Sequence, residues 1–138
     1  MTVFVDTSAL YALLDSDDAN HARARKQWAA LLETQEPLLT TSYVVVETAA
    51  LVQHRLGTEA SRALFDELLG VVEVIFVGPD THRAATAAWL VADRRKLSLV
   101  DCVSFQTMRE AGVTTAFAFD RHFVEQGFPS APASRGPR

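Results

Sequence analysis

The stretch Val3-Phe4-Val5-Asp6-Thr7-Ser8-Ala9-Leu10 begins with three consecutive apolar residues, which end at an acid. A short run that is apolar at every position is typical of a strand buried on both faces of a sheet. Three further runs of this kind follow along the chain, at residues 38–41, 72–77 and 114–119. Longer helical patterns separate them, and this alternation predicts a three-layer α/β/α domain around a central, mostly parallel sheet.

The helical patterns also have recognisable ends. Gly112 is typical of a residue that closes a helix, and Thr58, which follows a glycine, is predicted to cap the start of one. The expected helices cover residues 8–15, 20–33, 42–56, 58–69, 80–96 and 100–111, with a short last helix over 121–126.

The composition indicates one globular domain with a tail. The chain has 138 residues, of which 49% are hydrophobic and 22% are charged. That length is close to the roughly 150 residues of one average domain, and the composition excludes general disorder. We expect the domain to cover residues 1–128. Residues 129–138 are rich in Pro, Ala, Ser and Gly, and we expect them to form a disordered tail.

Charge and cysteine content exclude several classes of protein. The net charge of −4 argues against bulk electrostatic binding of nucleic acid, but not against an enzyme whose bound cation reverses the sign of an acidic site. The single cysteine, Cys102, excludes an internal disulfide and a Cys-based zinc cluster. No apolar run approaches the roughly 18 residues of a membrane span, and the first residues lack a signal-peptide pattern. We therefore expect a cytoplasmic protein with no membrane contact.

Several common catalytic motifs are missing from the sequence. The glycines are scattered, so no glycine-rich phosphate loop is present, and there is no G-x-S-x-G nucleophile turn. The four histidines show no spacing that suggests a metal site, and each is predicted to lie at the surface: His21, His54, His82 and His122.

Four acids, in contrast, lie beside apolar runs: Asp6, Glu47, Asp101 and Asp120. Asp6 and Asp120 directly follow predicted strands. Because the carboxyl ends of parallel strands form the ligand edge of an α/β sheet, both acids are expected at that edge. The helix after the second strand can bring Glu47 there, and the helix that begins near Asp101 can add the fourth carboxylate.

A cluster of this kind needs a compensating charge. Two carboxylates about 5 Å apart repel each other by roughly 3 kcal/mol at an effective dielectric constant near 20. Uptake of protons or binding of a cation relieves the repulsion. An all-oxygen acidic site suits Mg²⁺ or Mn²⁺ better than zinc, and such ions activate water and stabilise leaving oxygens. The pattern predicts metal-assisted hydrolysis of phosphodiester bonds.

Each acid also has a purely structural interpretation. Asp6, Asp101 and Asp120 stand where helices are predicted to begin, so each could serve as a helix cap. Glu47 is the only charge in an apolar stretch, and an ion pair with an arginine would explain it as well. Capping and catalysis are compatible, so these interpretations stay open at this point.

Small polar residues accompany the acids. Thr7, Ser8 and Ser104 are predicted to support the metal-binding acids from a second layer of contacts, with helix capping as the alternative. The basic run Arg94-Arg95-Lys96 precedes Asp101 and could guide an RNA backbone toward the site, although a solvated helix end also explains it.

The ordered set of motifs resembles a PIN domain, specifically the VapC-type toxin of a bacterial toxin–antitoxin pair. The resemblance covers about residues 1–128. It rests on the opening stretch and Glu47, and it is sharpest at Leu97-Ser98-Leu99-Val100-Asp101-Cys102-Val103-Ser104-Phe105 and at Phe119-Asp120-Arg121-His122-Phe123, with Gly127-Phe128 just beyond.

The resemblance implies an α/β/α ribonuclease that depends on Mg²⁺ or Mn²⁺. By position, the catalytic and metal-binding acids would be Asp6, Glu47, Asp101 and Asp120, with Asp6 and Asp101 in the most direct contact with metal. Some PIN proteins carry another acid within a turn of the third one, where this chain has Ser104, so the fourth carboxylate must come from Asp120. The implied partners are an RNA substrate (tRNA, rRNA or mRNA), a small VapB-type antitoxin and a second copy in a homodimer.

Two other functions stay open. A phosphatase of the haloacid dehalogenase type also begins with a strand and a nucleophilic Asp, but it usually has a second Asp where this chain has Ser8. A non-catalytic module could keep the acidic pocket for ion-dependent docking.

Overall fold

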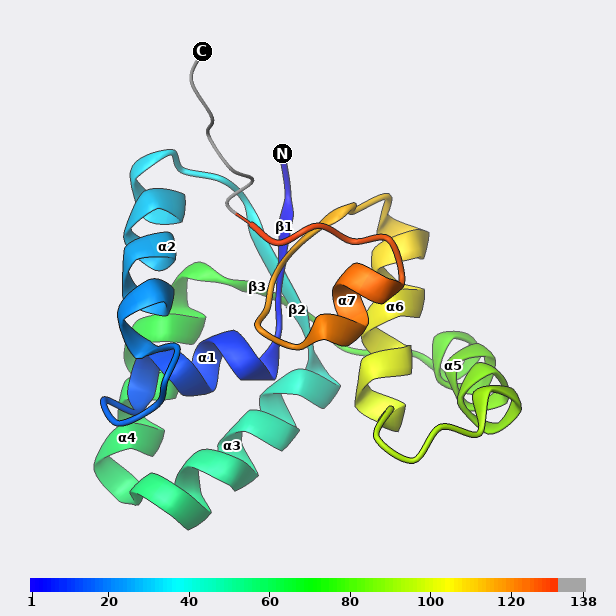
Figure 1. Ribbon diagram of the computed structural model, residues 1–138, viewed down its shortest axis with the longest axis horizontal. Helices are drawn as coiled ribbons and strands as arrows, with labels where there is room; N and C mark the ends of the chain where they lie inside the picture. Colours follow the sequence, from blue (N-terminus) through cyan, green and yellow to red (C-terminus); the bar gives the residue numbers. More distant parts are fainter. Residues whose placement is uncertain (132–138) are drawn as a thin grey trace.

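The predicted strands form one sheet, in which every strand runs parallel to its neighbours. The computed structural model describes residues 1–131 (Figure 1). Along the sheet the order is β3-β2-β1-β4. The strands are β1 (Val3–Val5), β2 (Leu38–Thr41), β3 (Glu73–Ile75) and β4 (Thr115–Phe117). The prediction of a parallel α/β/α domain is confirmed.

Helices cover both faces of this sheet. Figure 1 shows α1, α2 and α4 on one side and α5, α6 and α7 on the other, while α3 lies near the carboxyl ends of the strands. The helical segments are α1 (Thr7–Leu14), α2 (His21–Glu33), α3 (Ser42–Leu56), α4 (Thr58–Ala63), the π-turn η1 (Leu64–Leu68), the 3-10 turn η2 (Leu69–Val71), α5 (Pro79–Ala92), α6 (Leu99–Ala111) and α7 (Arg121–Glu125).

Aromatic side chains link the neighbouring strands β1 and β4 to both helical layers. Successive side chains of a strand point to opposite faces. Phe4 of β1 packs against Phe123 of α7, with ring centroids 6.1 Å apart. Phe117 of β4, which pairs with Val5, stacks on Trp28 of α2 at 6.2 Å. Every residue of these two strands is therefore buried, because helices cover both faces.

Two helix predictions differ from the structure. The helix expected over residues 80–96 ends at Ala92, because Asp93 adopts a left-handed conformation with φ of 49° and the next three residues are charged. Asp is one of the few residues that tolerate this conformation. The helix expected over 58–69 breaks into α4 and the turns η1 and η2. Gly57, with φ of 93°, occupies the cap position predicted for Thr58.

The edge strand and the tail also differ in extent. Of the strand expected over residues 72–77, only Glu73–Ile75 pairs, and it is partly exposed at the edge of the sheet. The first residues of the expected tail run beside β4, where Ala131 N–H donates to the Ala116 carbonyl at 2.7 Å. Residues 132–138 lie outside the described part of the chain. Among the described residues, no helix is long and apolar enough to cross a membrane.

Candidate active site

A pocket of about 340 Å³ opens at the carboxyl edge of the sheet, and all four predicted acids contribute to its wall. Asp6 follows β1, Glu47 lies on α3, Asp101 lies in the first turn of α6, and Asp120 follows β4. Two parallel strand ends, the second turn of α3 and the first turn of α6 therefore meet where the sequence predicted. The complete lining is Asp6, Thr7, Ser8, Glu47, Leu51, Lys96, Ser98, Asp101 and Asp120.

Asp6 is the most deeply buried of these acids, with 3% of its surface exposed. Its Oδ2 caps α1 by accepting from the Ser8 N–H at 3.1 Å and from the Ser8 hydroxyl at 2.7 Å. Burial raises the pKa of Asp6 to about 7, the nearby charges of Asp101 and Asp120 add to the rise, and the Ser8 hydrogen bonds oppose it. A buried carboxylate of this kind is stabilised by a neighbouring positive charge.

Two of the predicted supporting residues, Ser8 and Thr7, connect the elements around Asp6. The Ser8 hydroxyl donates to Asp6 and accepts from the Phe119 N–H at 2.9 Å, so it joins the end of β1 to the segment after β4. The Thr7 hydroxyl accepts from Thr48 at 3.0 Å, which ties α1 to α3 next to Glu47. Both contacts fix the distance between elements that carry the acids.

Asp101 sits in a capping box at the start of α6. The Ser98 hydroxyl accepts from the Asp101 N–H at 3.0 Å, and Asp101 Oδ2 accepts from the Ser98 N–H at 3.2 Å. Burial raises the pKa of Asp101, and the charge of Asp120 raises it further. The hydrogen bonds from Ser98 and the proximity of His122 lower it in part. The carboxylate is thus held in place, and its surroundings do not fully stabilise its negative charge.

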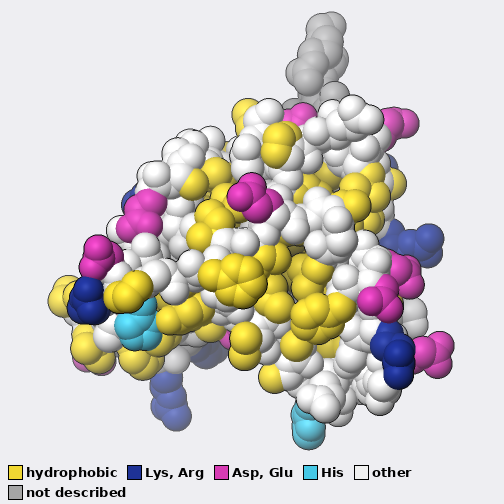
Figure 2. All heavy atoms as spheres, turned by 180° about the vertical axis from the view of Figure 1, so that it is seen from behind, with side chains coloured by type: hydrophobic (Ala, Val, Ile, Leu, Met, Phe, Trp, Pro, Cys, Tyr) yellow, Lys and Arg dark blue, Asp and Glu magenta, His cyan; other side chains and the backbone are white. Residues whose placement is uncertain are grey.

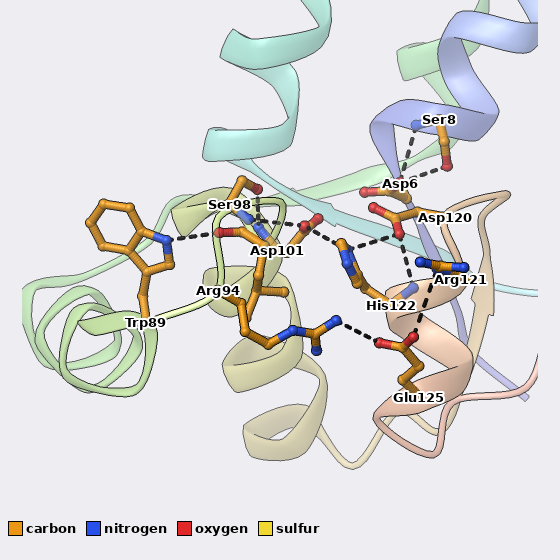
Figure 3. A network of polar contacts seen from close by, with 11 residues as sticks. Asp6, Ser8, Trp89, Arg94, Ser98, Asp101, Asp120, Arg121, His122 and Glu125 are labelled. Carbon is orange, nitrogen blue, oxygen red and sulfur yellow. Dashed lines mark hydrogen bonds and ion pairs between the residues drawn. The ribbon is translucent and has the colours of Figure 1, made fainter. Parts of the chain in front are cut away.

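Asp120 and His122, at the start of α7, lie beside Asp101 (Figure 3). Asp120 Oδ1 caps α7 by accepting from the His122 N–H at 2.9 Å. The His122 side chain turns back, so its Nδ1 lies 3.0 Å from Asp120 Oδ1 and 3.4 Å from Asp101 Oδ2. The prediction that His122 lies at the surface is wrong, since the residue is 8% exposed. Its spacing of two residues from Asp120 was the only signal in the sequence.

Glu47 and Ser104 have different positions from the other predicted residues. Glu47 is half-buried in the pocket wall and makes no ion pair among residues 1–131, so the proposed arginine partner is absent there. Ser104 is fully buried on α6, does not line the pocket, and its hydroxyl has no hydrogen-bond partner among the described residues. Only Glu47 of these two reaches the acidic pocket.

Two residues of the basic run Arg94-Arg95-Lys96 have different surroundings. Lys96 lines the acidic pocket, whereas Arg94 pairs with Glu125 of α7 at 3.2 Å (Figure 3). All three residues of the run are exposed. Lys96 can therefore draw a phosphate toward the acids, while Arg94 attaches the loop before α6 to α7.

The donor set fits a divalent cation. The pocket gathers four acids around one lysine, and Asp6 is buried there with hydrogen bonds but no ion pair among residues 1–131. One oxygen from Asp101, one oxygen from Asp120 and one nitrogen from His122 all lie within 4.8 Å of one another. Carboxylate oxygens at this density are suited to Mg²⁺ or Mn²⁺.

Comparison with known proteins agrees with this geometry. The PIN domain family model matches residues 3–129. The 23S rRNA-specific endonuclease VapC20 of Mycobacterium tuberculosis is 38% identical over 128 residues, which cover 91% of this chain and 95% of that protein. Its crystal structure, that of a Sarcin-Ricin loop cleaving toxin, superposes with a TM-score of 0.81 at 36% identity, over 91% of this chain and 95% of the other.

A more distant structure shares the fold. VapBC2 from Rickettsia felis, solved bound to a DNA fragment from the promoter of its genes, matches with a TM-score of 0.66 at 12% identity, over 94% of this chain and 97% of that one. The family match over nearly the whole domain and the close relative together show that this chain belongs to the PIN-domain family, among its VapC-type members.

Proposed function

We propose that this chain is a metal-dependent endoribonuclease that hydrolyses RNA phosphodiester bonds and acts as the toxin of a toxin–antitoxin pair. The observation that carries the proposal is the meeting of Asp6, Glu47, Asp101 and Asp120 in one pocket. The likeness to an rRNA-specific endonuclease supports the choice of RNA. The same likeness argues against an Asp-nucleophile phosphatase. Such an enzyme usually has a second Asp two residues after the first, whereas this chain has Ser8, whose hydroxyl donates to Asp6.

Asp6, Asp101, Asp120 and Glu47 are the residues that would hold Mg²⁺ or Mn²⁺. When bound, such an ion supplies activation of water and stabilisation of the leaving oxygen. The protein's own contribution is positioning. Ser8 fixes Asp6, the capping box of Ser98 fixes Asp101, and the helix start of α7 fixes Asp120. We propose that Glu47 orients the attacking water and that cleavage leaves a 5′-phosphate and a 3′-hydroxyl.

Lys96 is the cationic side chain among the pocket-lining residues. A phosphodiester that approaches the acids brings negative charge to a negative site, so a lysine at the rim lowers the repulsion. We assign to Lys96 the binding of a backbone phosphate beside the cleaved bond. Of the three RNA classes, we propose rRNA rather than tRNA or mRNA as the substrate of this chain, because the relative is an rRNA-specific endonuclease. We also propose a cytoplasmic location, because an RNA substrate of this kind is found there.

Two protein partners are part of the proposal. Large apolar side chains are exposed on α3, after β3 and on α5: Val46, Phe76, Leu90 and Val91. Figure 2 shows apolar side chains gathered over a broad area of the face opposite to that of Figure 1. Exposed apolar patches of this kind mark protein contacts, and a homodimer would cover them. A small VapB-type antitoxin would block the acidic pocket.

Cleavage of total RNA by the purified, antitoxin-free chain tests the function. Wild-type protein is expected to give discrete fragments with Mg²⁺ or Mn²⁺ and none with chelator. Asp101→Asn should lose cleavage, while Asp80→Asn, which changes an exposed acid on α5, should retain it. Mapping of fragment ends identifies the RNA class. Absence of cleavage by the folded wild-type protein with either ion, across all RNA classes, would contradict the proposal.

A further inference from the structure

His122 is a buried group that the proposed function leaves without a task. The residue is 8% exposed, and its Nδ1 makes no hydrogen bond among residues 1–131. Nδ1 nevertheless lies 3.0 Å from Asp120 Oδ1 and 3.4 Å from Asp101 Oδ2, and it points between the two carboxylates (Figure 3). A buried polar atom without a hydrogen bond is rare in folded proteins and costs free energy.

The three groups have the spacing of ligands around one ion. Their ligand atoms all lie within 4.8 Å of one another. Ligand distances to small divalent ions are about 2.0–2.2 Å, so two atoms on opposite sides of such an ion are roughly 4.4 Å apart. The contacts of Nδ1 with the two carboxylates lack hydrogen-bond geometry, and a cation between the atoms would give Nδ1 a bonding partner.

The donors are also held rigidly, as metal ligands generally are. Asp101 is fixed by its capping box with Ser98. Asp120 caps α7 through the backbone N–H of His122, which holds this carboxylate at the start of the helix that carries the imidazole. The next residue, Phe123, is 1% exposed and packs edge-on against Phe105 at 5.0 Å, which fastens the start of α7 to α6. Little rearrangement is needed before an ion binds.

We propose that His122 Nδ1 is a direct ligand of the metal centre, together with Asp101 and Asp120, and that it makes the centre prefer transition-metal ions to Mg²⁺. The inference rests on the proposed function, since it concerns the same acids. Mg²⁺ takes oxygen ligands, whereas imidazole binds first-row transition ions with affinity that rises from Mn²⁺ toward Co²⁺. Glu47 and Asp6 would complete the oxygen part of the site.

Electron spin-echo envelope modulation of the Mn²⁺-loaded full-length chain tests the nitrogen ligand directly. The wild-type protein is expected to show ¹⁴N modulation from one imidazole. His122→Gln, which offers an oxygen in place of the nitrogen, should bind Mn²⁺ without that modulation, whereas His54→Gln, at an exposed position on α3, should leave it unchanged. Labelling wild-type protein with ¹⁵N-histidine should remove the ¹⁴N frequencies without any substitution, so the test does not depend on how a variant folds.

Calorimetric titrations give a second readout. Wild-type protein is expected to bind Mn²⁺ at least tenfold more tightly than Mg²⁺, and His122→Gln should reduce that ratio to about threefold or less. Mn²⁺ binding by the wild type without nitrogen modulation, or modulation that persists in His122→Gln, would overturn the inference and leave the nuclease proposal standing. Binding of neither ion by the folded wild type would overturn both.

Discussion

Three of the four acids of the pocket come from two corners that are built differently, while Glu47 comes from α3. The first corner is the junction of β1 and α1, where Asp6 is buried and both hydrogen bonds to its carboxylate from the described residues come from Ser8. The second corner consists of Asp101, Asp120 and His122 at the starts of α6 and α7. There a nitrogen lies between two carboxylates. The first corner offers only carboxylate and hydroxyl oxygen, whereas the second also carries an imidazole nitrogen, the group that we propose distinguishes one cation from another.

Loss of the Asp6 charge is expected to have the largest effect. Asp6→Asn keeps an oxygen that can accept from Ser8, but it removes the most buried negative charge of the pocket. Metal ions contribute several kcal/mol of transition-state stabilisation, and each 1.4 kcal/mol is about tenfold in rate. Single-turnover RNA cleavage should therefore fall by about a hundredfold or more. Cleavage within about threefold of wild type would assign the catalysis to the second corner alone.

The metal-free stability of the first corner should depend on pH. The pKa of Asp6 is raised from 3.8 to about 7, so between these values the folded state binds a proton that the unfolded state does not. Stability from this group is complete below about pH 4, falls as pH rises to about 7, and is lost above it. The total change is at most about 4 kcal/mol.

Urea unfolding in the presence of chelator at pH 5 and pH 8 measures this dependence. The wild type should lose more stability than Asp6→Asn over that interval, and Asp6→Asn should be the more stable protein at pH 8. Asp80→Asn serves as the exposed control with the wild-type dependence. An identical pH dependence in wild type and Asp6→Asn would show that Asp6 is ionised in the folded, metal-free protein.

Ser8→Ala breaks the support of the first corner without changing its charge. The substitution removes the hydrogen bond to Asp6 at 2.7 Å and leaves the Phe119 N–H without its acceptor. A lost partner of this kind costs roughly 1–3 kcal/mol. We expect that loss of stability in chemical unfolding, together with a decrease of about tenfold in cleavage rate. Unchanged values of both would mean that water or the backbone replaces the hydroxyl.

Ser104→Ala should have the smallest effect. The Ser104 hydroxyl is fully buried beside the second corner on α6 and has no partner among residues 1–131. Removal of an unsatisfied buried hydroxyl, which leaves the methyl group of alanine, is neutral or stabilising by about 1 kcal/mol. Thermal unfolding and cleavage should both stay close to wild type. A decrease in cleavage of about tenfold would restore the supporting role that the sequence predicted for this residue.

The two corners also differ in how far the sequence reveals them. Asp6 and Asp120 follow apolar strand runs, so the topology of a parallel sheet places them at one edge. The capping interpretations are confirmed as well, because Asp6, Asp101 and Asp120 all accept from backbone N–H groups at helix starts. The structure supports the capping and the clustering of these residues together, and their metal-binding roles stay a prediction.

Residues whose environment comes from distant segments were not predictable. His122 stands two residues from Asp120, but its side chain also contacts Asp101 of another helix, and no local sequence pattern reports that contact. Ser104 lies one turn beyond Asp101, and only the packing of α6 decides that it turns to the interior. The early end of α5 depends on the left-handed backbone of Asp93, a conformation that this residue type adopts only occasionally and that the local sequence does not announce.

The central claim is that both corners bind the same metal centre. A double-mutant cycle of Mn²⁺ affinity, measured by calorimetry on wild type, Asp6→Asn, Asp101→Asn and the double variant, tests it most directly. If both acids hold one centre, each single substitution weakens binding by about tenfold or more, and the double variant loses much less than the product of the two effects. Fully multiplicative losses, or Mn²⁺ binding unaffected by either substitution, would contradict a shared centre.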